Sequence, residues 1–423
     1  MPVRRWRGGA APVKQVTEFT VGGTPAAGQV YSITINGRVV SYTAVGADTN
    51  TTIATKLKDN LVNSSFPEFL EVVWTSSSNK VTGEAVTAGR PYTATSSATG
   101  GGTLTANTTK AAAGPNFWNL ASNWHEGAVP ATNDDVIIDG GPSILYGIDQ
   151  GSVTLASLRI GPGFGTSEIG LPRFTAPDNS PTGYPEYRPQ RLNIKSSTVT
   201  IDSSSSRIRL NLGSTQTTIT VLRTGPASSD RDPAVEIIGS HASNVLRVLS
   251  GSVGVSHYAG DASQFATIEV AHRGTAGFAT TVSLGSDLTL ATLKQTGGIV
   301  VLACAVTTIT KERGELHRQG SGAVTTLNNF GGEVYDEGTG TITTLRNAGE
   351  YSRIGSSALT ITNAYLYAGS STDDTNGTIT WTNPVELQQC RLPGSPQATI
   401  GSSDGLPAYF NPGRNKKLTV QDI

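Results

Sequence analysis

The sequence contains little charge, few aromatic residues and almost no cysteine. Only 15% of its 423 residues are charged and 6% are aromatic, and the net charge is −1. A near-neutral chain lacks the basic surface that nucleic acids and anionic membranes normally require, so neither is expected as a partner. No run of about 18 apolar residues occurs, which excludes a transmembrane helix.

An export signal and metal-binding motifs are also missing. The basic start, Met1 to Arg7, is not followed by the apolar run of about 7–15 residues that a secretory signal contains. The two cysteines, Cys304 and Cys390, are therefore expected to be free buried thiols, with one disulfide as the alternative. No CxxC or HExxH spacing occurs, and we expect no metal and no cofactor.

Glycine and small polar residues are abundant instead. The chain has 49 glycines, and serine and threonine occur in nearly every segment, whereas only 36% of the residues are hydrophobic. The apolar material is thus spread thinly along the chain. This composition favours many short strands and turns over a compact α/β enzyme.

Residues 14–112 have the pattern of a small α+β docking domain. Two alternating segments, Gln29–Ile35 and Arg38–Thr43, are separated by only two residues. These are Asn36 and Gly37, which tolerate the positive φ angles of a type I′ turn, so a β-hairpin is predicted. Further strands are predicted at Leu70–Thr75, Lys80–Thr87 and Tyr92–Ser96.

One helix is predicted in this domain. Asp48 and Thr49 can cap its start, and an apolar stripe follows at Ile53, Leu57 and Leu61. Almost no helix is expected elsewhere in the chain. The three glycines at 100–102 and the small residues after them are expected to form the linker that leaves the domain.

Residues 113–150 form a junction with an unusual concentration of aromatic residues. Phe117, Trp118 and Trp124 lie within eight positions of one another. We interpret them as the cap of a stacked-strand body, because an uncovered end would expose unpaired backbone groups. Ordinary core packing and carbohydrate stacking are the alternatives for these rings.

An internal repeat is present in the second half of the chain. Four similar segments end in an apolar residue, and these residues are spaced by 16, 18 and 18 positions. A glycine follows each of them at an offset of five, five, five and four. The apolar landmarks are Leu293, Ile309, Leu327 and Leu345, and the glycines are Gly298, Gly314, Gly332 and Gly349.

This repeat predicts an elongated β-solenoid over residues 151–392. A single unit cannot bury its apolar face, so neighbouring units must stack and align their inward residues in a column. A β-sandwich made of the same short strands is the main alternative, but it would not require the repeat. The predicted fold is therefore mostly β, with a small N-terminal α+β domain before a β-helix-like body.

Three segments do not follow this pattern. Residues 1–13 are expected to form an N-terminal arm. Residues 161–190 are rich in proline and glycine, and we expect a long excursion from the solenoid there. Residues 393–423 are expected to form an irregular C-terminal arm with a final strand at Leu418–Ile423.

Candidate catalytic residues are few. The five histidines have no second ligand at metal spacing, so surface or turn roles are expected for them. Paired carboxylates could cleave a glycan, but each candidate lies in a turn-like context where aspartate is common for local reasons. The histidines are His125, His241, His257, His272 and His317, and the carboxylates are Asp134, Asp135, Asp139, Asp230, Asp232, Asp373 and Asp374.

Two segments resemble parts of known protein classes. The first domain, with its strand Phe19–Gly23, its hairpin and its helix Ile53–Leu61, resembles small domains repeated in bacteriophage virion proteins. The segment Phe117–Trp124, with Gly127 and Pro130, resembles the tryptophan-bearing lead-in to β-helices in phage proteins and bacterial surface proteins. The resemblance implies a class of particle or surface proteins and assigns no functional residue.

These features together predict a non-enzymatic structural protein on the exterior of a bacteriophage virion, first of all a capsid decoration or cement protein. A tail spike or receptor-binding adhesin is the alternative, and a glycan-cleaving enzyme is the third hypothesis. The missing export signal favours a virion protein, which is assembled in the host cytoplasm, over an exported adhesin. The expected partners are major capsid or tail proteins and further copies of the chain, with a trimer favoured and a glycan as an open alternative.

Overall fold

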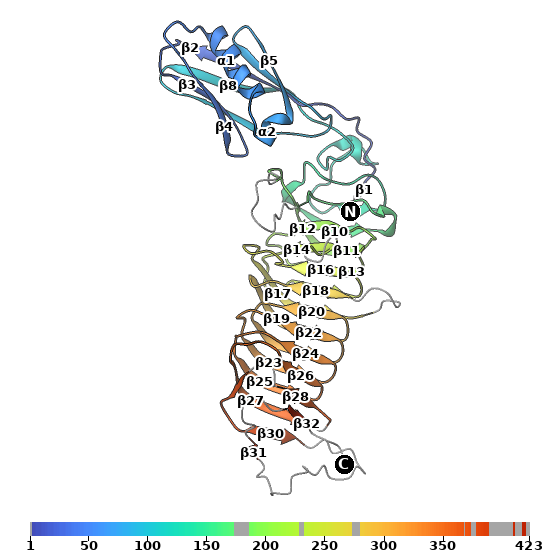
Figure 1. Ribbon diagram of the computed structural model, residues 1–423. Coiled ribbons are helices and arrows are strands. Elements are labelled where there is room, and N and C mark those ends of the chain that lie inside the picture. Colours follow the sequence, from blue (N-terminus) through green and yellow to red (C-terminus); the bar gives the residue numbers. More distant parts are fainter. Residues whose placement is uncertain are drawn as a thin grey trace.

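The strands of this chain form an elongated parallel coil with a small α+β domain at one end (Figure 1). The computed structural model describes residues 2–172, 186–227, 232–272, 280–367, 369–373, 378–388, 409–410 and 417–419. The protein is therefore mostly β, and the predicted fold class, a β-solenoid body after a small N-terminal domain, is confirmed.

The solenoid consists of two parallel sheets that share one core. The first contains β9 (Asp135–Ile138), β10 (Asp149–Ile160), β11 (Leu192–Asp202), β13 (Thr218–Arg223), β15 (Val245–Val248), β17 (Ser263–Val270), β19 (Leu288–Gln295), β21 (Val306–Lys311), β23 (Val324–Asn329), β25 (Ile342–Asn347), β27 (Leu359–Tyr367), β29 (Ile379–Trp381) and β30 (Val385–Gln388). The second contains β12 (Ile208–Asn211), β14 (Val235–Ile238), β16 (Ser252–Val255), β18 (Thr281–Leu284), β20 (Ile299–Leu302), β22 (Glu315–Arg318), β24 (Glu333–Asp336), β26 (Glu350–Arg353) and β28 (Ser371–Asp373).

From β11 to β29, consecutive strands alternate between the two sheets. From β11 to β27, each strand pairs in parallel with the strand two places further along the chain, as β19 does with β21 and β20 with β22. This pairing defines a coil in which each turn of the chain contacts the next one. The antiparallel β-sandwich is thereby excluded.

The four apolar landmarks of the repeat lie side by side in one column. Leu293 is in register with Ile309, which in turn is in register with Leu327. Leu327 is in register with Leu345, and all four side chains are fully buried. The predicted apolar column is therefore confirmed.

Three of the four glycine landmarks have a left-handed backbone. The φ angles of Gly298, Gly314 and Gly332 are 74°, 83° and 72°, in a region that residues with a Cβ seldom adopt. Gly349 is not among the glycines with positive φ. A Cβ at this position would nevertheless lie 2.8 Å from the carbonyl oxygen of Gly332, so the close stacking of the turns is what requires glycine there.

The small domain contains two antiparallel sheets and a helix. The strands are β2 (Val16–Gly23), β3 (Val30–Ile35), β4 (Arg38–Thr43), β5 (Val72–Ser77), β6 (Lys80–Ala85), β7 (Ala94–Ala98) and β8 (Gly102–Lys110). One sheet has the order β5-β6-β2-β8 and the other β4-β3-β7. Helix α1 (Asn50–Val62) packs on both sheets and buries Ile53, Leu57 and Leu61 in a core separate from that of the solenoid.

The hairpin and the helix cap of this domain agree with the sequence. Asn36 and Gly37 have φ angles of 51° and 74°, as a type I′ turn requires. Thr49 caps α1 by accepting a hydrogen bond from the backbone N–H of Thr52 at 3.2 Å. The other helices of the described residues are short: α2 (Pro67–Leu70) and two 3₁₀ turns, η1 (Ala121–Asn123) and η2 (Pro162–Phe164).

The predicted linker after residue 100 is wrong. Residues Gly102–Lys110 form β8, which pairs with β2 along its whole length. Gly100 and Gly101 belong to the turn between β7 and β8, where Gly100 has a φ of 64°. The small residues after them include several threonines, whose branched side chains favour extended backbone, so they continue the sheet.

Residues 1–13 are not a free arm. Strand β1 (Val3–Arg5) pairs in parallel with β9, and Trp6 is 3% exposed. The chain then leaves the solenoid, forms the small domain and returns beside its own exit, where Val13 and Ala113 form an antiparallel bridge. The small domain is therefore an insertion after the first strand of the solenoid.

The predicted excursion at 161–190 is too long. Phe164 and Ile169 are buried in the solenoid core, and Ile169 forms parallel bridges with Ile144 and Ile208. These apolar residues hold residues 161–171 on the body despite the surrounding glycines and prolines. Residues 173–185, which include three of the prolines, lie outside the described residues.

The last described coil ends the parallel series. Strand β32 (Lys417–Thr419) pairs antiparallel with β28, and β31 (Tyr409–Phe410) pairs antiparallel with β30. A final strand was expected at Leu418–Ile423, and the observed strand starts one residue earlier. The rest of the expected arm at 393–423 lies outside the described residues.

We predict that Leu327→Ala lowers the free energy of unfolding by about 2–5 kcal/mol, because it opens a cavity in a fully buried column. Thr325→Ala, on the exposed side of the same strand, is the control, and its effect should stay within about 0.5 kcal/mol. Urea unfolding followed by circular dichroism measures both. Equal effects of the two substitutions would contradict the column.

Candidate functional site

Three tryptophans close the upper end of the solenoid, which is the end next to the small domain (Figure 1). Trp118 and Trp124 are fully buried and meet edge to face, with their ring centroids 4.8 Å apart. Trp6 packs on Trp124 in the same manner at 5.2 Å. All three belong to the core of the solenoid. The two tryptophans predicted to cap the body therefore lie at its end, and aromatic pairs of this geometry stabilise it beyond their buried area.

Phe117 and Trp6 differ from the prediction. Phe117 is buried outside the main core and packs against Tyr146, at a centroid distance of 5.2 Å. Trp6 was missed, because the short strand before it, Val3–Arg5, shows no alternation of apolar and polar residues. Its place in the cap depends on a pairing across more than a hundred residues, which a local pattern does not reveal.

The three predicted carboxylates of the junction each have a local partner. Asp134 is 3% exposed and accepts a hydrogen bond from Arg4 at 2.8 Å. Burial by itself would raise the pKa of Asp134, but its hydrogen bonds lower this pKa below the usual value. Asp135 accepts from Ser157 at 2.5 Å, and Asp139 from the N–H of Gly163 at 2.7 Å.

The remaining carboxylates are spread over the molecule. Asp232 accepts a hydrogen bond from the hydroxyl of Tyr258. Asp373 lies at the other end of the solenoid, where the backbone register of β28 and β32 places it opposite Lys417. Asp230 and Asp374 lie outside the described residues.

The histidines have individual polar contacts. His257 shares a hydrogen bond with Ser283 at 2.9 Å, and His317 with Glu315 at 3.2 Å. Within the described part of the chain, no three histidine, cysteine, aspartate or glutamate side chains converge as a metal site requires. Cys304 is a free buried thiol whose pKa is raised by burial to about 12, so it has little thiolate character. Cys390 lies outside the described residues.

A short segment, residues 186–191, connects the small domain to the solenoid; we call it the strap. Its Arg188 side chain is 5% exposed and forms ion pairs with Glu71, in the small domain, and with Glu186. Arg188 also donates from Nε to the carbonyl oxygen of Pro91 at 2.6 Å. One guanidinium therefore fixes the strap to the small domain through charge and backbone.

The other end of the strap is fixed to the outer face of the solenoid. Arg191 donates from Nε to Glu236 on β14 at 2.8 Å and contacts Asp261 at 2.5 Å. Arg209 on β12 binds the second oxygen of Glu236 at 2.5 Å. Glu236 is 1% exposed, so little water screens these pairs. The strap is thus held by ion pairs in both bodies.

A hollow of about 190 Å³ lies beside the contact of the strap with the small domain. Leu70 and Val86 are 61% and 49% exposed and form part of its lining. Arg90, also in the lining, contacts Glu71 at 2.6 Å. The hollow therefore combines an apolar rim with charged groups that already pair with one another.

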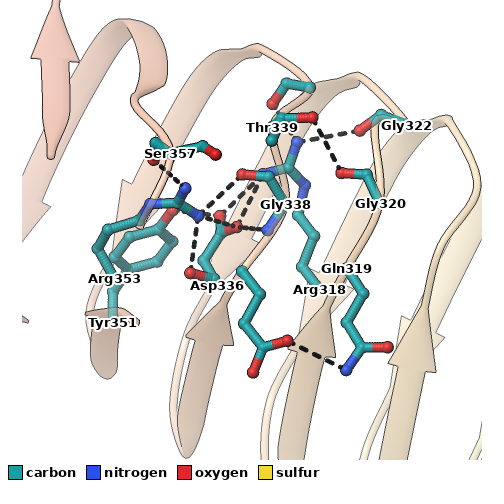
Figure 2. Close-up of polar contacts among 12 residues, drawn as sticks. Arg318, Gln319, Gly320, Gly322, Asp336, Gly338, Thr339, Tyr351, Arg353 and Ser357 are labelled. Carbon is teal, nitrogen blue, oxygen red and sulfur yellow. Dashed lines mark hydrogen bonds and ion pairs between the residues drawn. The ribbon is translucent and has the colours of Figure 1, made fainter. Parts of the chain in front are cut away.

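Two arginines and one aspartate are buried in one column at a corner of the coil (Figure 2). Arg318, Asp336 and Arg353 are in register on β22, β24 and β26 and are at most 1% exposed. Arg318 donates to both oxygens of Asp336 at 2.9 Å, and Arg353 donates to one of them at 3.2 Å. The hydroxyl of Tyr351 donates to the other at 2.5 Å, and burial raises the pKa of this tyrosine well above its usual value.

The same guanidinium groups hold the turns between coils (Figure 2). Their terminal nitrogens also reach backbone carbonyl oxygens: those of Gly322 and Gly340 for Arg318, and those of Gly338 and Ser357 for Arg353. The buried Nε atoms of the two arginines have no hydrogen-bond partner among the described residues. Buried charges are tolerated only when they are paired and hydrogen-bonded. This charge column therefore has a structural role, and it has no opening to a ligand.

A second buried polar column contains three amides and a lysine. Gln295, Lys311, Asn329 and Asn347 are in register and fully buried. Lys311 donates from Nζ to the carbonyl oxygen of Gly331 at 2.6 Å, and Asn329 donates to Asn347 at 2.8 Å. Burial lowers the pKa of Lys311 to about 8, although nearby glutamates oppose the shift.

The outer face of the second sheet has a column of like charges. Glu315, Glu333 and Glu350 are in register on three successive coils. Beside them the rings of His317 and Tyr335 stack at 4.9 Å. A hydrogen bond to Glu333 raises the pKa of Tyr335 to about 12. Like charges in neighbouring strands are unfavourable, so apolar packing of the coil outweighs them.

No protein-family model matches this chain, and no curated protein sequence matches it. Among the residues that the structure describes, no helix has the length and hydropathy needed to cross a bilayer. Function must therefore be inferred from the architecture and from the side chains above.

We predict that Lys311→Gln stabilises the protein at neutral pH by at most about 3 kcal/mol. Below pH 8 the lysine is protonated in both states, and the folded state bears the full cost of burying the charge. Between pH 8 and 10.5 only the unfolded state keeps the proton, so this cost falls as pH rises. The stability difference between variant and wild type, measured by urea unfolding from pH 7 to 10.5, should therefore shrink. A constant difference would contradict the lowered pKa.

We predict that Arg188→Ala frees the small domain to move, because breaking a buried ion pair costs about 3–5 kcal/mol. Spin labels at the exposed positions Thr55 and Thr325 should show one narrow distance distribution in the wild type and a broad one in the variant. Lys80→Ala removes an exposed ion pair of the same domain and is the control. A narrow distribution in the Arg188 variant would show that the two chain crossings suffice to fix the domain.

Proposed function

We propose that this protein is a non-enzymatic structural component of the exterior of a bacteriophage particle, where it acts as a capsid decoration protein. The observation that carries the proposal is the fixed attachment of the small domain. This domain is inserted at the capped end of a long solenoid and held there by the strap. A rod with a docking domain fixed at one end suits a surface-bound protein.

The solenoid is suited to span neighbouring subunits of a particle. Each coil contacts only the coils next to it, so the body is long and its outer faces are accessible. The described solenoid strands pair with strands of the same chain. A trimer, the favoured oligomer, would then form through outer faces and not through interleaved strands.

The resemblance of the small domain and of the tryptophan segment to parts of virion proteins supports a particle as the location. The near-neutral charge fits a protein partner better than a nucleic acid or an anionic membrane. Capsid subunits or tail subunits are the proposed partners, and the small domain is the proposed contact.

A receptor-binding tail protein is the second candidate. The stacked rings of His317 and Tyr335 beside Glu333 favour it. Sugar rings stack on aromatic faces, and the hydroxyl groups of a sugar donate hydrogen bonds to carboxylates. The two candidates place the protein at different positions on the particle.

Gold labelling of a C-terminal tag on purified particles tests the proposal. We expect regularly spaced label over the heads in negative-stain images. Label confined to the tail would favour the receptor-binding candidate, and tagged protein that does not sediment with particles would contradict both. Release of sugar from host surface polysaccharide by the purified protein would contradict the non-enzymatic role.

A further inference from the structure

Most columns of the solenoid contain similar residues in successive coils, so they would tolerate a change in the order of the coils. The apolar landmarks Ile309, Leu327 and Leu345 have similar shape and are equally buried. The outward residues Thr308, Thr326 and Thr344, in register on the same strands, are identical. If one coil were left out of the stack, these positions would meet equivalent neighbours.

The amide column is equally tolerant. Lys311 faces Asn329, and the next residue in this column is Asn347, with the same side chain. An amide oxygen would therefore face Lys311 whether or not the coil at 324–341, which separates Lys311 from Asn347, is in place. Neither hydrophobic burial nor this column specifies the order of the coils.

The charge column does specify an order. Its residues in successive coils are Leu302, Arg318, Asp336 and Arg353. Only the native order places a carboxylate between the two guanidinium groups. Without the coil at 324–341, Arg318 would face Arg353 at the strand spacing of about 4.8 Å, buried and without a carboxylate.

We propose that the buried column Arg318–Asp336–Arg353 fixes the place of the coil at 324–341 in the stack, and that it excludes arrangements in which this coil is skipped. A stack of nearly equivalent coils has many alternative registers of similar burial, and these are a hazard for folding. A buried carboxylate that two arginines share makes a register that skips its coil incompatible with charge, because the two guanidinium groups would then face each other. Buried polar groups in other proteins fix register in the same way.

Two deletions of 18 residues each test this inference. Deletion of 306–323 leaves the column Leu302, Asp336 and Arg353, in which the carboxylate keeps a guanidinium. Deletion of 324–341 leaves Leu302, Arg318 and Arg353, in which two guanidinium groups meet. Both deletions remove one coil and keep the native turn lengths at the new junction. They differ in this column and in Lys311, which only the first deletion removes, so the decisive comparison is made within the second deletion.

We expect the protein lacking 306–323 to remain soluble and to melt cooperatively by circular dichroism. The protein lacking 324–341 should lose its cooperative transition or become insoluble. Adding Arg318→Asp to the second deletion recreates the column of the first, and it should restore the transition.

Three results would overturn the proposal. The first is equal melting of the two deletion proteins, which would show that the charges do not discriminate between registers. The second is a failure of Arg318→Asp to restore folding, since some other feature of the removed coil would then be required. The third is insolubility of both deletion proteins, because the order of the coils would then depend on more than this column.

Discussion

The whole structure depends on the in-register stacking of parallel strands. A single coil cannot bury its own apolar face, so each coil is stable only on another one. Register then assigns every position in a coil to a column. The column that contains Leu327 is apolar, the one that contains Asn329 is made of amides and a lysine, and the one that contains Asp336 is charged. Neighbours in a column must be compatible, which is a stronger condition than burial alone.

A stack of this kind has two ends that would otherwise expose unpaired strands. The upper end is closed by three tryptophans and by β1, which adds a strand beyond β9. At the lower end β32 and β31 pair antiparallel with β28 and β30. A reversal of strand direction stops the parallel series, because the hydrogen-bonding pattern of the next coil no longer matches.

The small domain is joined to the solenoid by more than a linker. The chain enters and leaves it at adjacent points, and the strap adds ion pairs through Arg188 and Arg191. Such pairs are sensitive to geometry and contribute less to stability than hydrophobic burial of similar size. Their role here is to select one arrangement of the two bodies, as the proposed function of a docked rod requires.

The sequence by itself determined the features that have a local signal: the repeat with Leu327 and its glycines, the hairpin at Asn36, the capped helix and two of the three tryptophans of the cap. Tertiary structure decided how distant segments meet. Glu71 and Arg188 are 117 residues apart. Trp6 packs on Trp124 in the cap, although the whole small domain separates the two residues in the sequence. Alternation along a strand shows which side chains point inward, but their partners in the next coil are fixed only when the coils stack, because register is a property of two strands and not of one.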